Sequence, residues 1–269
     1  MSFTVNKLDL KDFEMQYVRF GRGEKTLVIL PGLSIQSVVF AAALIEKQYE
    51  IFSREFTVYL FDRRDNLPES YCVYDMAEDT AKAMKELGLD KTCLFGTSQG
   101  AMMALVIAAN HSELVSRLVI GSAICKADDS IDIIEEWIEF AQKGKTEELC
   151  LSFGENVYPK DFFSQNRQAF ISMAKTVTQD NLKRFLILAK GTRHFDASEC
   201  LNKIQCPVLF ISDTDDKVFG NNAGSDIFKK LKNNESAQLY MYSGYGHAVY
   251  DMAPDYTYRL YDFFTENIN

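Results

Sequence analysis

Histidine is scarce in this sequence. Its 269 residues include only three, His111, His194 and His247, which lie far apart along the chain. Three histidines on distant elements offer no spacing suited to a metal site, so we expect no bound metal. The same scarcity leaves only three candidates for any chemistry that needs an imidazole base.

Features of secreted, membrane and nucleic-acid-binding proteins are missing as well. No basic N-terminal stretch precedes an apolar one, and no apolar run approaches the length of a membrane span. The six cysteines form no CxxC pair and are expected to be reduced, mostly buried thiols rather than a disulfide frame. The formal net charge of −9 comes from scattered acidic residues. We therefore expect a cytoplasmic protein that binds neither nucleic acid nor membrane, and the oligomeric state stays open.

What the sequence does contain is an alternation of strands and helices in a chain long enough for a large core. Residues 14–20 alternate polar and apolar, as an outer antiparallel strand does. Apolar runs typical of buried strands occupy residues 26–30, 57–61, 93–95, 117–121, 207–211 and 237–242. Helical stretches lie near residues 36–50, 74–88, 101–109 and 222–232, and from Pro254 onward. This order predicts an α/β fold with a mostly parallel central sheet and helices on both faces.

The alternation of strand and helix patterns stops between residues 123 and 200. This segment has no apolar runs typical of buried strands, and its large apolar residues are spaced as in helices. Ile134, Trp137, Ile138 and Ala141 fall on one helix face, while Phe162, Phe163, Phe170 and Met173 indicate a second and a third helix. We therefore expect a core domain of residues 1–122 and 201–269, interrupted by a helical cap of residues 123–200.

The most informative stretch is Gly96-Thr97-Ser98-Gln99-Gly100. An apolar strand enters it and an almost wholly apolar helix leaves it, so Ser98 is expected at a tight turn between two buried elements. Glycine at 96 and 100 lets the helix start approach the strand closely. This context predicts a nucleophile elbow that exposes the Ser98 hydroxyl.

A serine hydroxyl needs an adjacent base at neutral pH. His247 follows the last strand on a glycine-rich loop that lets the imidazole reach over the strand ends, and we assign it as the base. His111 reads as a helix-terminal residue, and His194 lies where the cap returns to the core. Three carboxylates after the strand at 207–211, namely Asp213, Asp215 and Asp216, are candidates to orient the base.

These pieces resemble one known family. The matching segments are Leu30-Pro31-Gly32-Leu33, the turn around Ser98, residues 207–218 and Gly246-His247. Over nearly its whole length the chain looks like a capped, esterase-like serine hydrolase of the α/β-hydrolase fold. Members of that fold carry the chain order serine, acid, histidine.

The resemblance implies roles for individual residues. It places the acid at Asp216, with Asp215 and Asp213 as alternatives, and the oxyanion-binding amides at Leu33 and Gln99. Serine hydrolases of this kind need no cofactor. The loop after residue 61 lacks the two glycines common in relatives, and Asp62 and Arg63 are expected to support loops by ion pairing.

The expected reaction is hydrolysis of a carboxylic ester or a similar small, partly apolar acyl substrate through an acyl-enzyme. Trp137, Phe162, Phe163 and His194 are the candidate substrate-binding residues, and the cap aromatics are expected to form an apolar wall. Carbon–carbon bond hydrolases, peptidases and lyases share this scaffold, and a slow ligand-binding receptor is a further alternative.

Overall fold

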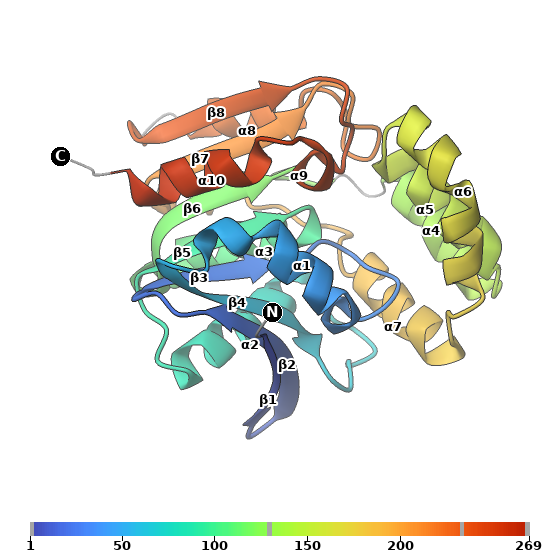
Figure 1. Cartoon of the computed structure of the whole chain (residues 1–269), viewed down its shortest axis with the longest axis horizontal. Coiled ribbons are helices and arrows are strands. Elements are labelled where there is room, and N and C mark those ends of the chain that lie inside the picture. The colour runs from blue at the N-terminus through green and yellow to red at the C-terminus, as the bar shows by residue number, and fades with distance from the viewer. Residues whose placement is uncertain (1–2, 128–130, 232–233, 267–269) are drawn as a thin grey trace.

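The computed structural model describes residues 3–127, 131–231 and 234–266, in which eight strands form one sheet in the order β1-β2-β4-β3-β5-β6-β7-β8 (Figure 1). The strands are β1 (Thr4–Leu10), β2 (Phe13–Gly21), β3 (Lys25–Leu30), β4 (Phe56–Arg64), β5 (Thr92–Thr97), β6 (Val115–Gly121), β7 (Val208–Asp213) and β8 (Ala237–Tyr242). The pairs β1/β2 and β2/β4 are antiparallel, and the other neighbouring pairs are parallel. The predicted mostly parallel sheet is confirmed.

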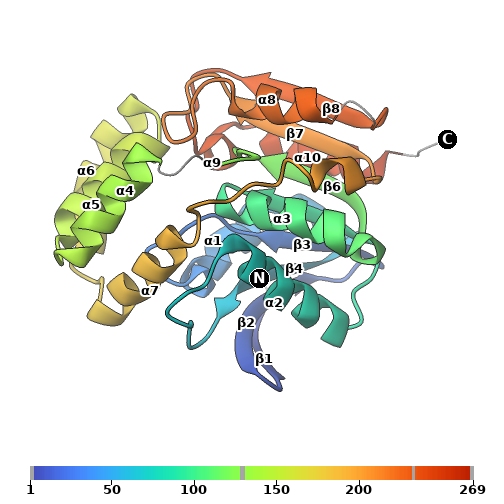
Figure 2. The same cartoon turned by 180° about the vertical axis from the view of Figure 1, so that it is seen from behind.

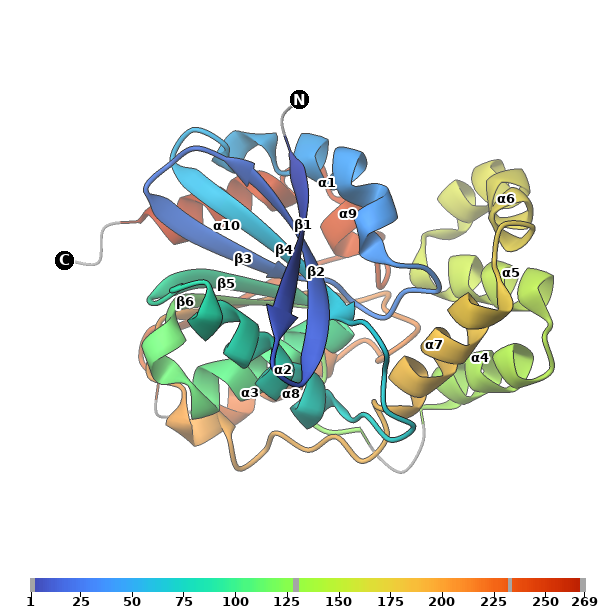
Figure 3. The same ribbon diagram turned by 90° about the horizontal axis from the view of Figure 1, so that it is seen from below.

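Helices cover both faces of this sheet (Figure 3). One face carries α2 (Val73–Glu86), α3 (Gln99–Asn110) and α8 (Ala223–Lys230), and the other carries α1 (Ala42–Gln48), α9 (Val249–Met252) and α10 (Tyr256–Thr265). Helices α2 and α3 bury a continuous apolar surface. α3 is apolar on all sides because it lies between the sheet and α2. None of the helices in the described residues is long and apolar enough to cross a membrane.

Four helices between β6 and β7 stand at one end of the sheet (Figures 1 and 2). They are α4 (Asp132–Gln142), α5 (Thr146–Val157), α6 (Lys160–Ala174) and α7 (Gln179–Lys190), and we call them the cap. Residues 128–130 of the expected cap lie outside the described residues. The face of α4 predicted from Ile134, Trp137, Ile138 and Ala141 is its buried face.

The expected second and third cap helices were wrong in one respect. Phe162, Phe163, Phe170 and Met173 all lie on α6, and the flanking helices α5 and α7 bury other residues instead. On α6 only Ala174 is fully buried. The large side chains of α6 lie over a neighbouring helix and along a cavity, where they are only partly buried. Apolar spacing therefore located the helical region but not the number of helices.

Two further elements differ from expectation. β1 pairs with β2 along its whole length although none of its residues is fully buried, so its side-chain pattern carried little signal. The helix expected over residues 36–50 is broken into a short 3-10 helix at Val38–Ala41, α1, and a second 3-10 turn at Glu50–Phe52. The expected helix 222–232 corresponds to α8, and its residue 232 lies outside the described residues.

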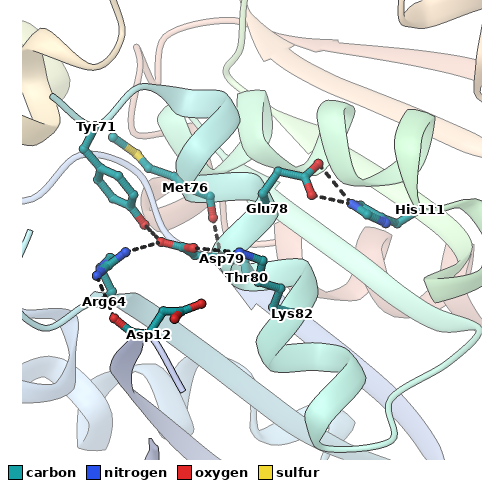
Figure 4. A network of polar contacts seen from close by, with 9 residues as sticks. All are labelled: Asp12, Arg64, Tyr71, Met76, Glu78, Asp79, Thr80, Lys82 and His111. Atoms are coloured by element: carbon teal, nitrogen blue, oxygen red, sulfur yellow. Dashed lines mark hydrogen bonds and ion pairs between the residues drawn. The ribbon is translucent and has the colours of Figure 1, made fainter. Parts of the chain in front are cut away.

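Polar contacts fix α2 to its neighbours (Figure 4). The guanidinium of Arg64, at the end of β4, lies 3.3 Å from the Asp79 carboxylate, which also accepts a hydrogen bond of 2.9 Å from the Tyr71 hydroxyl. At the other side of the helix, the His111 ring lies 3.0 Å from the Glu78 carboxylate. His111 is thus held at the end of α3, as its helix-terminal position predicted.

The turn between β5 and α3 depends on two glycines. A Cβ atom at Gly96 would lie 2.4 Å from the Gly100 oxygen, and one at Gly100 would lie 2.1 Å from the Leu30 oxygen. Real Cβ atoms do not approach backbone oxygens so closely, so both positions exclude every other residue. This confirms the spatial reason predicted for the two glycines.

We expect Gly100→Ala to lower the free energy of unfolding by about 3 kcal/mol or more, because the overlap is with backbone that cannot move aside. Gly88→Ala is the matched control. Gly88 has a φ of +66° but open space around it, so this change costs only about 1 kcal/mol of backbone strain. Urea unfolding followed by circular dichroism measures both. Equal losses in the two variants would contradict the close-packing argument.

Candidate active site

Ser98 occupies a strained turn at the end of β5. Its φ of +52° and ψ of −123° lie outside the regions that L-residues prefer, and such a residue costs on the order of 1–3 kcal/mol. The turn is held by a hydrogen bond of 2.9 Å from the Ser98 amide to the Gly121 oxygen and by the first turn of α3. The Ser98 side chain therefore stands at the C-terminal edge of the sheet, where it is 9% exposed.

His247 lies on the loop after β8, and two carboxylates shape that loop. Asp213 accepts a hydrogen bond of 2.9 Å from the Tyr245 amide, and Asp215 accepts one of 2.8 Å from the Gly244 amide. Gly244 has a φ of +91°, which favours glycine. Asp213 and Asp215, the alternative candidates for the acid, thus hold the backbone of the histidine loop and do not contact the imidazole.

The structure brings Ser98, His247 and Asp216 into one hydrogen-bonded chain. The His247 Nε2 atom lies 2.9 Å from Ser98 Oγ, and its Nδ1 atom lies 2.9 Å from Asp216 Oδ2. The amides of Val218 and Phe219 donate to the other oxygen of Asp216 at 2.8 and 3.0 Å. Since Nδ1–H donates to a carboxylate, Nε2 is left to accept the serine proton.

The Asp216 carboxyl is kept ionised despite its burial. Burial by itself raises the pKa of a carboxyl, but the His247 charge, its hydrogen bond and the two backbone amides outweigh this effect and lower the pKa of Asp216 below its usual value. An ionised Asp216 is the form that orients the imidazole and stabilises its protonated state.

Leu33 and Gln99 lie on the two segments that flank the serine. A Cβ atom at Gly32 would lie 3.0 Å from Ser98 Cβ, so the loop after β3 runs directly against Ser98. Gln99 is the first residue of α3, where a backbone N–H has no acceptor in a preceding helical turn. The structure therefore places Gln99 and Gly32, the residue before Leu33, beside Ser98.

A cavity of about 700 Å³ adjoins this site. Gly32 and Thr97, the neighbours of Ser98, form part of its wall, and α1 and the cap helices α5 and α6 form the sides. Its apolar wall includes Leu33, Phe40, Leu44, Phe153, Phe162 and Met173. Phe40 and Leu44, one helical turn apart, are 81% and 73% exposed and form the rim.

Comparison with known proteins agrees with this architecture. A sequence model of the family described as alpha/beta hydrolase fold matches residues 25–144. The human serine hydrolase BPHL is 25% identical over 243 residues, which are 86% of this chain and 77% of that protein. This chain has the α/β-hydrolase fold.

Solved structures show the same fold over nearly the whole chain. An α/β-hydrolase enzyme from a Medee basin deep-sea metagenome library has a TM-score of 0.85 and 22% identity, with 98% of both chains covered. The enol-lactonase from Burkholderia xenovorans has a TM-score of 0.83 and 15% identity, with 97% of this chain and 100% of that chain covered.

Three of the four predicted substrate-binding residues lie away from this cavity. Only Phe162 lines the cavity. Trp137 is buried inside the cap, where its indole N–H donates to Ser152 Oγ at 3.1 Å. Phe163 packs against Phe170 and α5, and His194 is exposed on the turn after α7. Cap helices need a core of their own, and Trp137 belongs to it.

Sequence reasoning missed the other wall of the cavity. Phe40, Leu44 and Asp251 lie on short helices of the core domain, and Tyr158 follows the end of α5. No motif marks these positions, because only the folded chain brings α1 and α9 opposite the cap. Asp62 forms the expected ion pair, at 2.7 Å, but with Arg184 on cap helix α7. Arg63, for which ion pairing was also expected, instead donates to the Pro31 oxygen and to Gln99 Oε1.

Asp251 is the acidic residue of the cavity wall. Its carboxylate accepts weak hydrogen bonds of 3.4 Å from Gln48 and Tyr158. Asp251 is exposed to solvent as a residue, but the protein packed around its carboxyl partly desolvates it and raises the pKa of Asp251 to about 6. An ionised Asp251 is therefore unfavourable for the folded state.

We expect Asp251→Asn to stabilise the protein at pH 8. The folded pKa of about 6 exceeds the unfolded value of about 3.9, so Asp251 costs stability as the pH rises from about 4 through 6. After allowance for solvent in the cavity, the gain is about 1 kcal/mol at pH 8 and vanishes near pH 4. Unfolding in urea at both pH values measures it.

Asp255→Asn is the matched control. Tyr242 and Arg259 donate to the Asp255 carboxylate and outweigh its partial burial, so the pKa of Asp255 is lowered. The stabilisation of the folded state by the ionised Asp255 is present above the unfolded pKa. Asp255→Asn should therefore lose stability at pH 8. A gain for Asp251→Asn that persists undiminished at pH 4 would contradict the assignment to its charge.

Proposed function

We propose that this protein is a serine hydrolase that cleaves a carboxylic ester or a similar small acyl substrate through an acyl-enzyme intermediate. The observation that carries the proposal is the hydrogen-bonded chain from Ser98 through His247 to Asp216, beside a mostly apolar cavity whose wall includes Gly32 and Thr97. A nucleophile, a base and a group that orients the base are the parts that acyl transfer requires.

In the first half of the reaction, Ser98 Oγ attacks the carbonyl carbon of the ester while His247 Nε2 takes the hydroxyl proton. The carbonyl oxygen becomes an oxyanion, which the backbone N–H groups of Leu33 and Gln99 stabilise. The carbon–oxygen bond to the alcohol then breaks, and the alcohol leaves with the proton that His247 returns. The acyl group remains on Ser98.

Water completes the cycle. His247 takes a proton from a water molecule whose oxygen attacks the acyl carbon, and the second tetrahedral intermediate uses the same two amides. Breaking the bond to Ser98 Oγ releases the carboxylic acid, and Ser98 regains its proton from His247. Throughout, Asp216 holds the Nδ1–H of the imidazole and stabilises its positive charge.

The cavity supports a partly apolar substrate. Most of its wall is aliphatic or aromatic. Phe40 and Leu44 extend this apolar surface to the solvent-exposed rim. Exposed apolar side chains at the mouth of a cavity favour a ligand that covers them. A lactone is a cyclic ester, so the likeness to an enol-lactonase is compatible with ester chemistry.

The first test is covalent labelling of the serine. A fluorophosphonate probe should add once to the wild-type protein and not to Ser98→Ala, and the same variant should lose at least about 10³-fold in kcat on p-nitrophenyl butyrate. Intact mass spectrometry and initial rates measure the two effects. Labelling or turnover that survives in Ser98→Ala would contradict the assignment of Ser98.

The second test concerns the apolar rim. In Phe40→Ser/Leu44→Ser, kcat/KM for p-nitrophenyl octanoate should fall about 10-fold relative to that for the acetate, because the longer acyl chain loses apolar contact. Tyr258→Ser is the control, since Tyr258 is 61% exposed on α10 and does not line the cavity. An equal loss for both esters in the rim variant would contradict a substrate-binding role.

A further inference from the structure

Arg63 is an almost wholly buried cation at the end of β4, with 3% of the residue exposed. Its Nη2 atom donates to the Pro31 oxygen at 2.8 Å and to Gln99 Oε1 at 3.2 Å. Burial lowers the pKa of Arg63 to about 10, with Asp62 opposing this effect and Arg184 adding to it, so the guanidinium remains charged at neutral pH. A buried charge is costly, so its contacts call for a functional explanation.

The two acceptors of Arg63 belong to different segments of the chain. Pro31 begins the loop that leads to Leu33, and Gln99 begins α3 just after Ser98. One nitrogen therefore ties together the two segments that carry the proposed oxyanion donors. Their spacing is set by contacts between chain segments that are distant in sequence.

Gln99 is held at its other end as well. Its Nε2 atom donates to the Leu188 oxygen of cap helix α7 at 2.7 Å. With Arg63 on its oxygen and α7 on its nitrogen, the Gln99 side chain has a fixed orientation, and its backbone is fixed at the start of α3. The ion pair between Arg184 of the same cap helix and Asp62, next to Arg63, braces this arrangement.

We propose that Arg63 is a positioning residue of the oxyanion hole, which sets the distance between the Leu33 and Gln99 backbone amides by bonding to both of their segments. This inference rests on the proposed function. Arg63 acts through the two amides and does not touch the substrate. Because oxyanion donors act only when they meet the developing charge at hydrogen-bond distance, a small displacement of either amide reduces transition-state stabilisation more than substrate binding.

The sequence neighbour supplies a matched control. Arg64 points to the other side of the strand end, where it bonds to Asp79 and to the Asp12 oxygen and lies over the Phe13 ring (Figure 4). It is a partly buried arginine with as many polar partners as Arg63, but none of them belongs to the site. Arg64→Met should therefore lower stability without changing kcat.

The experiment compares Arg63→Met with Arg64→Met on p-nitrophenyl butyrate, with rates expressed per folded protein. Arg63→Met should lose 10- to 100-fold in kcat with KM nearly unchanged, and Arg63→Lys, which keeps a charged donor, should recover part of the loss. An alkyl trifluoromethyl ketone, which forms a tetrahedral oxyanion on the serine, should bind more weakly to Arg63→Met by a similar factor. The matching methyl ketone should bind equally to both proteins.

A double-mutant cycle with Gln99→Met tests the route of the effect. If Arg63 acts through Gln99, the combined variant should lose less in kcat than the product of the two single losses. Unchanged kcat and trifluoromethyl ketone affinity in Arg63→Met would overturn the inference, as would a loss confined to KM or to stability. Failure of the proposed function itself would look different, since the wild-type protein would then show no turnover and no labelling that depend on Ser98.

Discussion

The close approach of α3 to the end of β3 is the constraint on which this site depends. Gly100 lies against the backbone of Leu30 and Pro31, and Gly96 lies against Gly100. This contact holds Ser98 in a strained backbone conformation and presses the Gly32 loop against its side chain. The strain is sustained because α3 is buried along almost its whole length, and that burial outweighs a local cost on the order of 1–3 kcal/mol.

The cap is bonded to the site at several points and does more than cover it. Its helix α7 contacts the core through Arg184 and through the Leu188 oxygen. At the end of α5, the Val157 oxygen accepts a hydrogen bond of 2.8 Å from Ala248, the residue after His247. The nucleophile side and the histidine side of the site are thus both attached to cap helices, so the position of the cap and the geometry of the site are coupled.

Prediction from sequence succeeded where chemistry and backbone conformation require particular residue types. The glycines around Ser98 and the order of buried strands are local patterns, and they located the fold and the residues that meet at its edge. It did not separate Trp137 and Phe163 from the residues that line the cavity, because an aromatic residue on a cap helix has the same spacing whether it packs against other cap residues or faces the cavity. β1 was missed because its backbone pairs with β2 while its side chains stay exposed.

The sequence by itself determined the α/β fold, the strained turn at Ser98 and the candidate partners of that serine, because each rests on local residue pattern or on the requirement for glycine. Only the tertiary structure decided which of Asp213, Asp215 and Asp216 contacts His247, since three carboxylates at the end of β7 and just after it differ in direction and not in chemistry. It also decided that Arg63 spans the loop after β3 and the start of α3. Such contacts depend on how distant segments pack, which no local pattern encodes.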